Sequence, residues 1–245
     1  MPASRTDRSK DESPPKAARE KSKKNAPAKA KAYETQTELM RMTLKACLIA
    51  RDATFNIQDL LTNSSRMAFL AIRDCEKELD QIERQIDEQL PAAITRVNER
   101  KARQLLACLK CITDLERIGD LVMGVAQRVQ GRSGQLSQAD VRHLIQMAVV
   151  LHDMLNDIHR GFVSLDIENA RKVLRTDSEL DRICHAMFQQ HLANSREKGS
   201  LGFEVLLMAQ ALERCGDHTK NLAEELYGLI EGHTLRHLPK RVAAP

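Results

Sequence analysis

The sequence predicts an all-α protein built from two tandem, structurally similar three-helix bundles. Three observations lead to this prediction: a composition typical of helices, apolar residues at helical spacing, and two halves that repeat one acidic pattern. Tryptophan is absent, only 2 Tyr and 5 Phe occur among 245 residues, and helix-favouring Leu, Ala, Arg, Glu, Gln and Met dominate. The hydrophobic content of 42% is sufficient for a buried core.

The first half has the pattern of three helices. From residue 34, apolar residues recur at steps of three and four, as one buried helix face requires. They are Leu39, Met42, Ala46, Ile49, Ala53, Ile57 and Leu60. The polar run 62–65 ends this helix and offers N-caps for a second helix, which we expect to end near Pro91. A third helix is predicted from about residue 95 to residue 129, before the glycine loop 131–134.

After the glycine loop the pattern begins again. Ser137 and Asp140 are spaced like an N-terminal capping device for a fourth helix. Asp166 can cap a fifth helix, and a sixth is predicted from about residue 201 to residue 230, before Gly232. Three helices, a glycine loop and three more helices indicate a duplication.

The N-terminal segment differs from the rest of the chain. Residues 1–32 hold ten Lys or Arg against four Asp or Glu, a net charge of +6, so that the remainder of this +4 chain carries −2. The segment has almost no large apolar side chain, which predicts a disordered Lys/Ala/Pro-rich tail over residues 1–33. We expect bundles over residues 34–131 and 135–232 and a short tail over 233–245. The mildly acidic remainder excludes a broad nucleic-acid footprint on the fold and leaves the tail as the candidate for polyanion binding.

Two further features indicate where the protein resides. The sequence has no apolar run of the ~18 residues that span a bilayer and no apolar secretory segment, which predicts a soluble, cytoplasmic protein. Its six cysteines should then be reduced thiols. Cys108 and Cys111 form a C-x-x-C within a helical pattern, and no second cysteine pair completes a structural zinc site, so we expect them in the core.

Carboxylates stand in pairs, four residues apart, at four places in the chain. The pairs are Glu76/Asp80, Glu116/Asp120, Asp177/Asp181 and Glu213/Asp217. This spacing places both members of a pair on one helix face, where like charges repel. The first and third pairs are 101 residues apart and the second and fourth are 97 apart. Duplicated halves would give this result if the difference lies in a connecting loop.

Antiparallel packing of the second helix on the third, and of the fifth on the sixth, would gather the pairs into two patches of four carboxylates. Such patches suit Mg²⁺, Mn²⁺, Ca²⁺ or iron, with zinc also compatible, and a bound cation would leave positions open for anions such as phosphate. The alternative is a solvated acidic face with Arg117 and Arg214 as salt-bridge partners. Gly119 and Gly216 lie inside the motifs, where glycine costs about 1 kcal/mol relative to alanine, so we expect a close helix approach there.

Two segments form a recognisable pair: Thr113–Asp120, and Leu212–His218 followed by Asn221, Ala223 and Glu224. They resemble the paired signature of the PhoU family, and the resemblance covers residues 34–232. It implies two three-helix bundles whose carboxylate motifs bind multinuclear clusters of iron, zinc, manganese or magnesium. It also implies a protein that represses the phosphate-starvation response and modulates high-affinity phosphate uptake. The implied partners are the ATPase of the phosphate ABC transporter, through which the protein would lie at the inner membrane, a sensor histidine kinase, and a second copy in a homodimer.

The two signatures differ at three positions. The second has His218, Asn221 and Glu224 where the first has Leu121, Gly124 and Gln127. We expect the three polar side chains, with Arg117 and Arg214, to surround the metal as outer-shell partners, and the N-terminal site to bind metal more weakly.

Two alternative functions stay open. A di-metal carboxylate enzyme of the ferritin-like type uses Glu-x-x-His on bundle helices, and no Glu in this chain has His three residues later. A helical adaptor would instead dock a basic partner on its acidic faces without metal. The sequence contains no recognisable nucleophile with its base, Gly-rich phosphate loop or nucleotide fingerprint, so we predict that the protein is not an enzyme.

Overall fold

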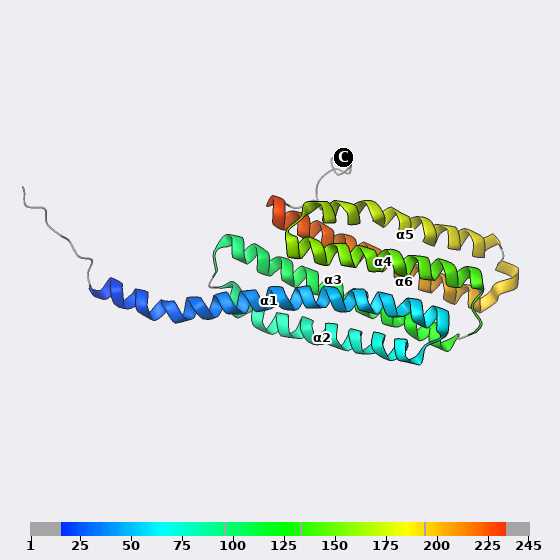
Figure 1. The fold of residues 1–245 in the computed structure, drawn as a ribbon, viewed down its shortest axis with the longest axis horizontal. Helices are drawn as coiled ribbons and strands as arrows, with labels where there is room; N and C mark the ends of the chain where they lie inside the picture. The colour runs from blue at the N-terminus through cyan, green and yellow to red at the C-terminus, as the bar shows by residue number, and fades with distance from the viewer. Residues whose placement is uncertain (1–15, 96, 133, 194, 234–245) are drawn as a thin grey trace, which may run out of the picture.

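The computed structural model describes residues 16–95, 97–132, 134–193 and 195–233, and within these ranges the chain forms six α-helices (Figure 1). The first half contains α1 (Lys16–Asn63), α2 (Arg66–Ile94) and α3 (Glu99–Gly131). The second half contains α4 (Gln138–Ser164), α5 (Ile167–Ala193) and α6 (Ser195–Glu231). The predicted all-α fold with two three-helix halves is confirmed.

Short polar side chains determine where most helices begin. Ser65, Asn98 and Ser137 are in extended conformation, and their side chains accept hydrogen bonds from backbone N–H groups at the starts of α2, α3 and α4. Asp166 Oδ1 accepts a 3.0 Å hydrogen bond from the backbone N–H of Glu168 at the start of α5. These side chains satisfy donors that the first helical turn leaves without intrahelical partners.

The structure differs from the sequence prediction at the start of α1. The helix begins at Lys16, so residues 16–33, which the prediction assigned to a disordered tail, are helical. Ala and Lys, which are frequent in this segment, favour the helical backbone. Residues 1–15 of the predicted tail, and residues 234–245, lie outside the described residues.

Two other helices are longer than predicted. α2 continues three residues past Pro91, to Ile94. The proline lies in the last turn, where the helix loses one hydrogen bond without being divided. α6 begins at Ser195, six residues before the predicted start at residue 201.

The helices make contacts both within each half and between the halves. α1, α2 and α3 contact one another, as do α4, α5 and α6, while α1 packs on α4 and α3 packs on α6. α2 and α5 therefore lie on opposite outer sides of the molecule (Figure 1). The groove between α2 and α3 is consequently separated from the groove between α5 and α6 by the helices of the central layer.

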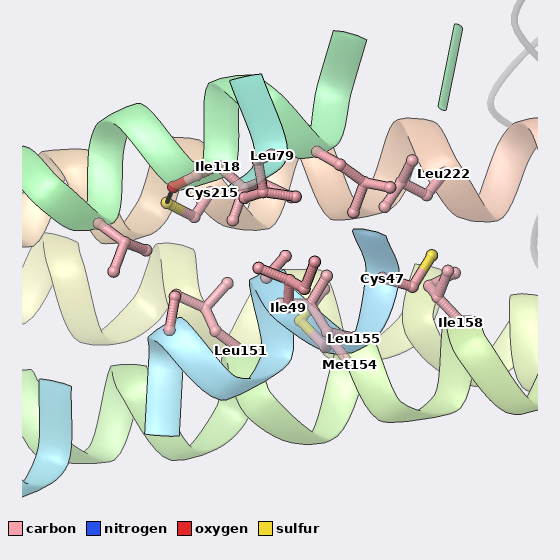
Figure 2. Close-up of a cluster of buried hydrophobic side chains, with 14 of the residues drawn as sticks. Cys47, Ile49, Leu79, Ile118, Leu151, Met154, Leu155, Ile158, Cys215 and Leu222 are labelled. Carbon is pink, nitrogen blue, oxygen red and sulfur yellow. Dashed lines mark hydrogen bonds between the residues drawn. The ribbon is translucent and has the colours of Figure 1, made fainter. Parts of the chain in front are cut away.

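A continuous hydrophobic core joins the two halves. Buried side chains from all six helices form one cluster, part of which is drawn in Figure 2. Ile118 and Cys215 occupy equivalent positions, 97 residues apart, and the Cys215 thiol lies 3.9 Å from the carbonyl oxygen of Ile118. Since α1 packs on its equivalent α4 and α3 packs on its equivalent α6, the halves make the contacts expected for an approximate two-fold axis between α3 and α6.

The thiols and the helix hydropathy agree with the sequence analysis. Cys108 and Cys111 are buried, as predicted for core residues, and all six cysteines are free. In the described ranges, no helix combines the length and the apolar character needed to cross a membrane.

Candidate functional site

The four predicted carboxylates of the second half lie along the groove between α5 and α6, near enough to influence one another electrostatically. Asp177 is buried, with 6% of its surface exposed. Burial, together with the charges of Asp217, Asp181 and Asp177, raises the pKa of the Glu213 carboxyl. Burial and the charges of Asp177 and Asp217 likewise raise the pKa of Asp181. Each helix thus contributes charges that oppose ionisation on the other, as the predicted antiparallel packing requires.

A lysine that the sequence analysis did not select lies in this groove. Lys220 Nζ is 2.7 Å from Asp177 Oδ2, and this hydrogen bond raises the pKa of the lysine. Lys220 follows Asp217 by three residues on α6, and its equivalent in the first half is Met123. The second groove therefore contains an internal cation at a position where the first groove has a thioether.

The groove between α2 and α3 is built around Glu116. Burial, followed by the charges of Asp120 on α3 and Glu83 on α2, raises the pKa of the Glu116 carboxyl. Burial and the neighbouring Asp87 also raise the pKa of Glu83. Glu83 was not among the predicted residues, although it follows Asp80 by three positions and therefore shares its helix face.

The predicted pair on α2 lines the same groove. Glu76 is half-buried, and its Cα lies 3.8 Å from the point where a Cβ on Gly119 would stand. Asp80 is also half-buried and forms an ion pair with Arg84, one turn further along α2. Asp80 thus has a positively charged side chain as its partner, as Asp177 has in Lys220, but this partner lies on the same helix.

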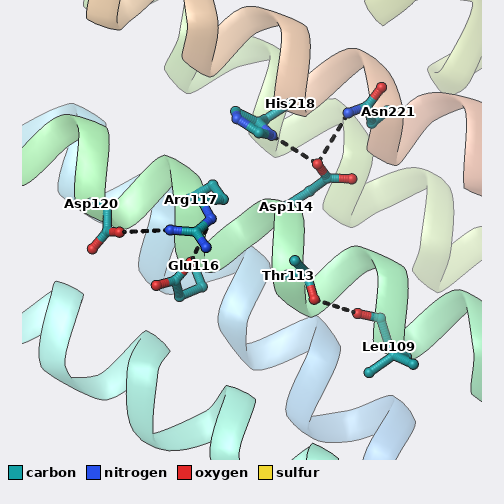
Figure 3. Close-up of polar contacts among 8 residues, drawn as sticks. All are labelled: Leu109, Thr113, Asp114, Glu116, Arg117, Asp120, His218 and Asn221. Atoms are coloured by element: carbon teal, nitrogen blue, oxygen red, sulfur yellow. Dashed lines mark hydrogen bonds and ion pairs between the residues drawn. The ribbon is translucent and has the colours of Figure 1, made fainter.

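One carboxylate oxygen in this groove lacks a hydrogen bond. Glu116 Oε2 is buried and has no hydrogen-bond partner among the described residues. Arg117 Nε lies 3.5 Å from it, beyond a well-formed hydrogen bond, and Arg117 Nη1 lies 3.4 Å from Asp120 Oδ2 (Figure 3). A buried charged oxygen without a donor is costly, so this atom is suited to receive a cation or an external donor.

Glycines allow the helices of both grooves to approach closely. A Cβ on Gly119 would lie 2.7 Å from Leu79 Cδ1. A Cβ on Gly216 would lie 2.5 Å from Leu180 Cδ1 and 3.6 Å from Asp177 Oδ1. In each half an equivalent leucine, Leu79 or Leu180, faces an equivalent glycine. This confirms the predicted close approach of the helices.

His218 and Asn221 lie at the interface between the halves. His218 Nδ1 is 2.8 Å from Asp114 Oδ1, and Asn221 Nδ2 donates a 3.1 Å hydrogen bond to the same oxygen (Figure 3). The side chains of Asp114 and His218 are 13% and 22% exposed, so the contact is largely shielded from water. These two predicted outer-shell residues therefore contact α3, and their partner Asp114 is one that the sequence analysis did not select.

The other predicted outer-shell residues of α6 lie near the second groove. Arg214 is exposed, and its charge partly opposes the rise in the pKa of Glu213 that burial and the neighbouring carboxylates cause. Glu224 is half-buried, and its charge adds to the rise in the pKa of Lys220 that the Asp177 hydrogen bond begins.

The chemistry of the grooves fits a divalent cation better than their present spacing does. Carboxylate oxygens are the ligands that hard cations prefer, and Glu116 Oε2, which has an ion-pair partner but no hydrogen bond, provides a further acceptor. Across the part of the chain that the structure describes, no three His, Cys, Asp or Glu side chains are placed closely enough to hold an ion. The grooves thus supply suitable donors, and binding would require their side chains to move together.

Comparisons with known proteins place this architecture in a family. The PhoU domain model matches residues 39–129 and 144–226, one segment in each half. A phosphate-specific transport system accessory protein PhoU homolog of Burkholderia sp is 30% identical over 194 residues, covering 76% of this chain and 83% of that protein. A protein of the same name from Pseudomonas putida is 26% identical over 225 residues, covering 86% of each chain.

Solved structures share the fold. The crystal structure of PhoU from Pseudomonas aeruginosa superposes with a TM-score of 0.72 at 22% identity, covering 82% of this chain and 99% of that one. The phosphate transport system regulatory protein PhoU from Streptococcus pneumoniae gives a TM-score of 0.75 at 20% identity, covering 83% and 99%. Since the family model matches both halves and the acidic signatures lie in equivalent grooves, this chain belongs to the PhoU family.

Proposed function

We propose that this protein regulates phosphate homeostasis by repressing the phosphate-starvation response and modulating uptake through a phosphate ABC transporter. The observation that carries the proposal is the match of both halves to the PhoU domain. Relatives that align over more than four fifths of their own length are named as accessory proteins of phosphate-specific transport systems. The protein acts by binding and not by catalysis.

The proposed partners are the transporter ATPase and a sensor histidine kinase, with a second copy of the chain in a homodimer. The protein would then reside in the cytoplasm and reach the inner membrane through these partners. Its two acidic grooves support this arrangement, because they lie between different helix pairs and are separated by the central helices. One groove can therefore contact a partner without covering the other.

We further propose that the grooves bind divalent or trivalent cations, as single ions or clusters of iron, zinc, manganese or magnesium. The ligands would be Glu76, Asp80, Glu116 and Asp120 in the first groove and Asp177, Asp181, Glu213 and Asp217 in the second. The buried Glu116 oxygen that lacks a hydrogen bond and the raised pKa values of Glu116 and Glu213 support this proposal. A bound cation offsets the carboxylate repulsion and can hold an anion such as phosphate.

Metal analysis separates cation binding from an adaptor function. The ion pairs Lys220–Asp177 and Arg84–Asp80 favour the adaptor, since they show that the acidic pairs accept protein cations. Protein purified without chelator should contain iron, zinc, manganese or magnesium by elemental mass spectrometry. A stoichiometry near zero would support the adaptor.

We expect Asp217→Asn to remove more metal than Asp120→Asn, and equal losses would contradict a stronger second site.

Deletion of the gene tests the regulatory role. The deletion strain should produce alkaline phosphatase in high phosphate, and the wild-type gene supplied in trans should restore repression. A strain with both Glu116→Gln and Glu213→Gln should show whether repression needs the grooves. Unchanged repression in the deletion strain would refute the proposed function.

A further inference from the structure

The excess positive charge of the N-terminal region lies in one stretch of helix. Residues 16–33, the first part of α1, hold seven Lys or Arg and one acidic residue, Glu20. The three basic and three acidic residues that precede them cancel, so the whole net charge of +6 belongs to residues 16–33. This helical segment is called the basic arm below.

The basic arm leads away from the bundle. α1 is one helix from Lys16 to Asn63, and Figure 1 shows that its N-terminal part continues past the ends of the other five helices. At the rise of an α-helix the arm is about 27 Å long. The PhoU domain match begins at residue 39, so the arm lies outside the part of the chain that the family shares. Membership of the family therefore assigns it no role.

The bundle has the opposite charge. Residues 34–233 hold 25 Lys or Arg against 30 Asp or Glu, a net charge of −5. A polyanion is attracted by the arm and repelled by such a body. Because the arm extends beyond the bundle, a long anion can lie along it without lying on the acidic body.

The composition of the arm indicates which polyanion it fits. A helix that lies on a membrane surface needs an apolar face with residues such as Leu, Phe or Trp, and residues 16–33 contain none of these. Binding of single-stranded nucleic acid uses several aromatic side chains as stacking platforms, and Tyr33 is the one aromatic residue of the arm. The phosphate backbone of a duplex requires neither, since it is recognised by charge.

We propose that the basic arm binds duplex DNA through its phosphate backbone, without preference for sequence. Six of the seven cations are lysines, which act on phosphate as point charges, whereas arginine makes the commonest specific contact with guanine. An α-helix fits the major groove of B-form DNA, while the deep, narrow major groove of duplex RNA does not admit it.

The length of the arm matches its charge to the duplex. About 27 Å of helix spans roughly 8 bp of DNA, which carry about 16 phosphates. The seven cations of the arm therefore meet more phosphates than they can neutralise, and each can release a condensed counterion. This inference does not rest on the proposed function of the bundle.

Fluorescence anisotropy of the full chain with a labelled DNA duplex of about 20 bp, longer than the arm can cover, tests the proposal. The duplex should bind at low salt, and the logarithm of the association constant should fall linearly with the logarithm of the salt concentration. The expected slope is about −5, the value for roughly six neutralised phosphates. Unlabelled duplexes of unrelated sequence should compete equally well.

A variant that combines Lys21→Ala, Lys23→Ala and Lys24→Ala tests the arm itself. Alanine keeps the helix propensity of these positions, so the Tm should stay unchanged. The salt slope should become shallower by about 2–3, and affinity at low salt should fall by at least about tenfold, because three phosphate contacts are lost.

The matched control combines Lys77→Ala, Arg142→Ala and Arg175→Ala, which remove the same charge from exposed positions on the bundle. It should keep the wild-type slope and affinity. Equal weakening in both variants would assign binding to the overall charge and overturn the role of the arm. Absence of DNA binding at low salt would also overturn the proposal, as would tighter binding to vesicles of phosphatidylglycerol than to the duplex. Repression in the deletion strain tests the bundle separately.

Discussion

Lys220 Nζ lies 2.7 Å from Asp177 Oδ2, so the buried first carboxylate of the Asp177/Asp181 pair has its counter-ion on the neighbouring helix. The equivalent residue in the first half is Met123, which cannot serve this purpose. The two grooves have the same backbone arrangement and different internal charge, and this difference determines how each should respond to mutation and to added cation.

Lys220→Met distinguishes two effects of this lysine: its contribution to stability and its competition with a cation for Asp177. Without metal, the loss of the counter-ion should lower the free energy of unfolding by about 1–3 kcal/mol, because buried Asp177 is left without a partner. At the same time the affinity of the second groove for a divalent cation should rise. Urea unfolding and calorimetric titration measure the two quantities.

Lys172→Met is the matched control for that change. Lys172 Nζ lies 2.7 Å from buried Asp157 Oδ2, an ion pair of the same kind that joins α4 to α5 outside the grooves. This variant should also lose stability but should keep the wild-type cation affinity. Equal cation affinity in both variants would show that Lys220 does not compete with metal.

Glu213→Gln should stabilise the metal-free protein at neutral pH. The folded-state pKa of Glu213 is raised above its ordinary value of 4.5, chiefly by burial and then by Asp217 and Asp181. A carboxyl of this kind binds its proton more readily in the folded state, so its cost is fully present above the folded pKa and disappears below the unfolded pKa. The Tm of the variant should therefore exceed that of the wild type by about 1–3 °C at pH 7.

The difference in Tm should shrink as the pH falls through the raised pKa and should vanish below about pH 4. Thermal unfolding in chelator across this range provides the measurement. Exposed Glu88 on α2 serves as the control, since Glu88→Gln should change Tm little. A lower Tm for Glu213→Gln at pH 7 would mean that this carboxylate makes a favourable contact in the folded state.

Two glycines of α3 should respond to alanine in opposite directions. Apart from the backbone of its own helix turn and its chain neighbours, no atom of the described residues lies within 4 Å of a Cβ on Gly124, so Gly124→Ala should stabilise the protein by about 0.5–1 kcal/mol through helix propensity. A Cβ on Gly119 would meet the fully buried Leu79 at 2.7 Å, so Gly119→Ala should be less stable than Gly124→Ala by about 2 kcal/mol. Urea unfolding of both variants tests this, and equal stability would show that Leu79 can move aside.

The contact between the halves should depend on a carboxylate or amide oxygen at position 114. Asp114→Ala leaves His218 and Asn221 without their acceptor and should lower the free energy of unfolding by about 1–3 kcal/mol. Asp114→Asn retains an acceptor oxygen and should lose less than half as much. Denaturant unfolding compares them, with Asp153→Ala on the exposed face of α4 as the control. Equal losses for Asn and Ala would contradict the hydrogen-bonding role.

The sequence was sufficient for features that depend on local pattern. The six helices follow from apolar periodicity and from caps such as Ser137, and the duplication follows from the spacing of the acidic pairs. Lys220, Glu83 and Asp114 escaped prediction because their importance arises from a neighbouring helix, and a single sequence does not show which residues face one another across an interface. The start of α1 was missed because the prediction gave more weight to the scarcity of large apolar residues in the segment than to the helix propensity of its Ala and Lys residues.

The contact between Ile118 and Cys215 has a further consequence. A chain that ended at Gly131 would leave uncovered the surfaces of α1 and α3 that now pack on α4 and α6. Two copies of such a chain could cover those surfaces for each other about the same axis. This is the arrangement expected if two copies of a three-helix chain that paired as a dimer were fused by gene duplication. The two halves now differ at equivalent positions: Lys220 and Cys184 stand where the first half has Met123 and Glu83.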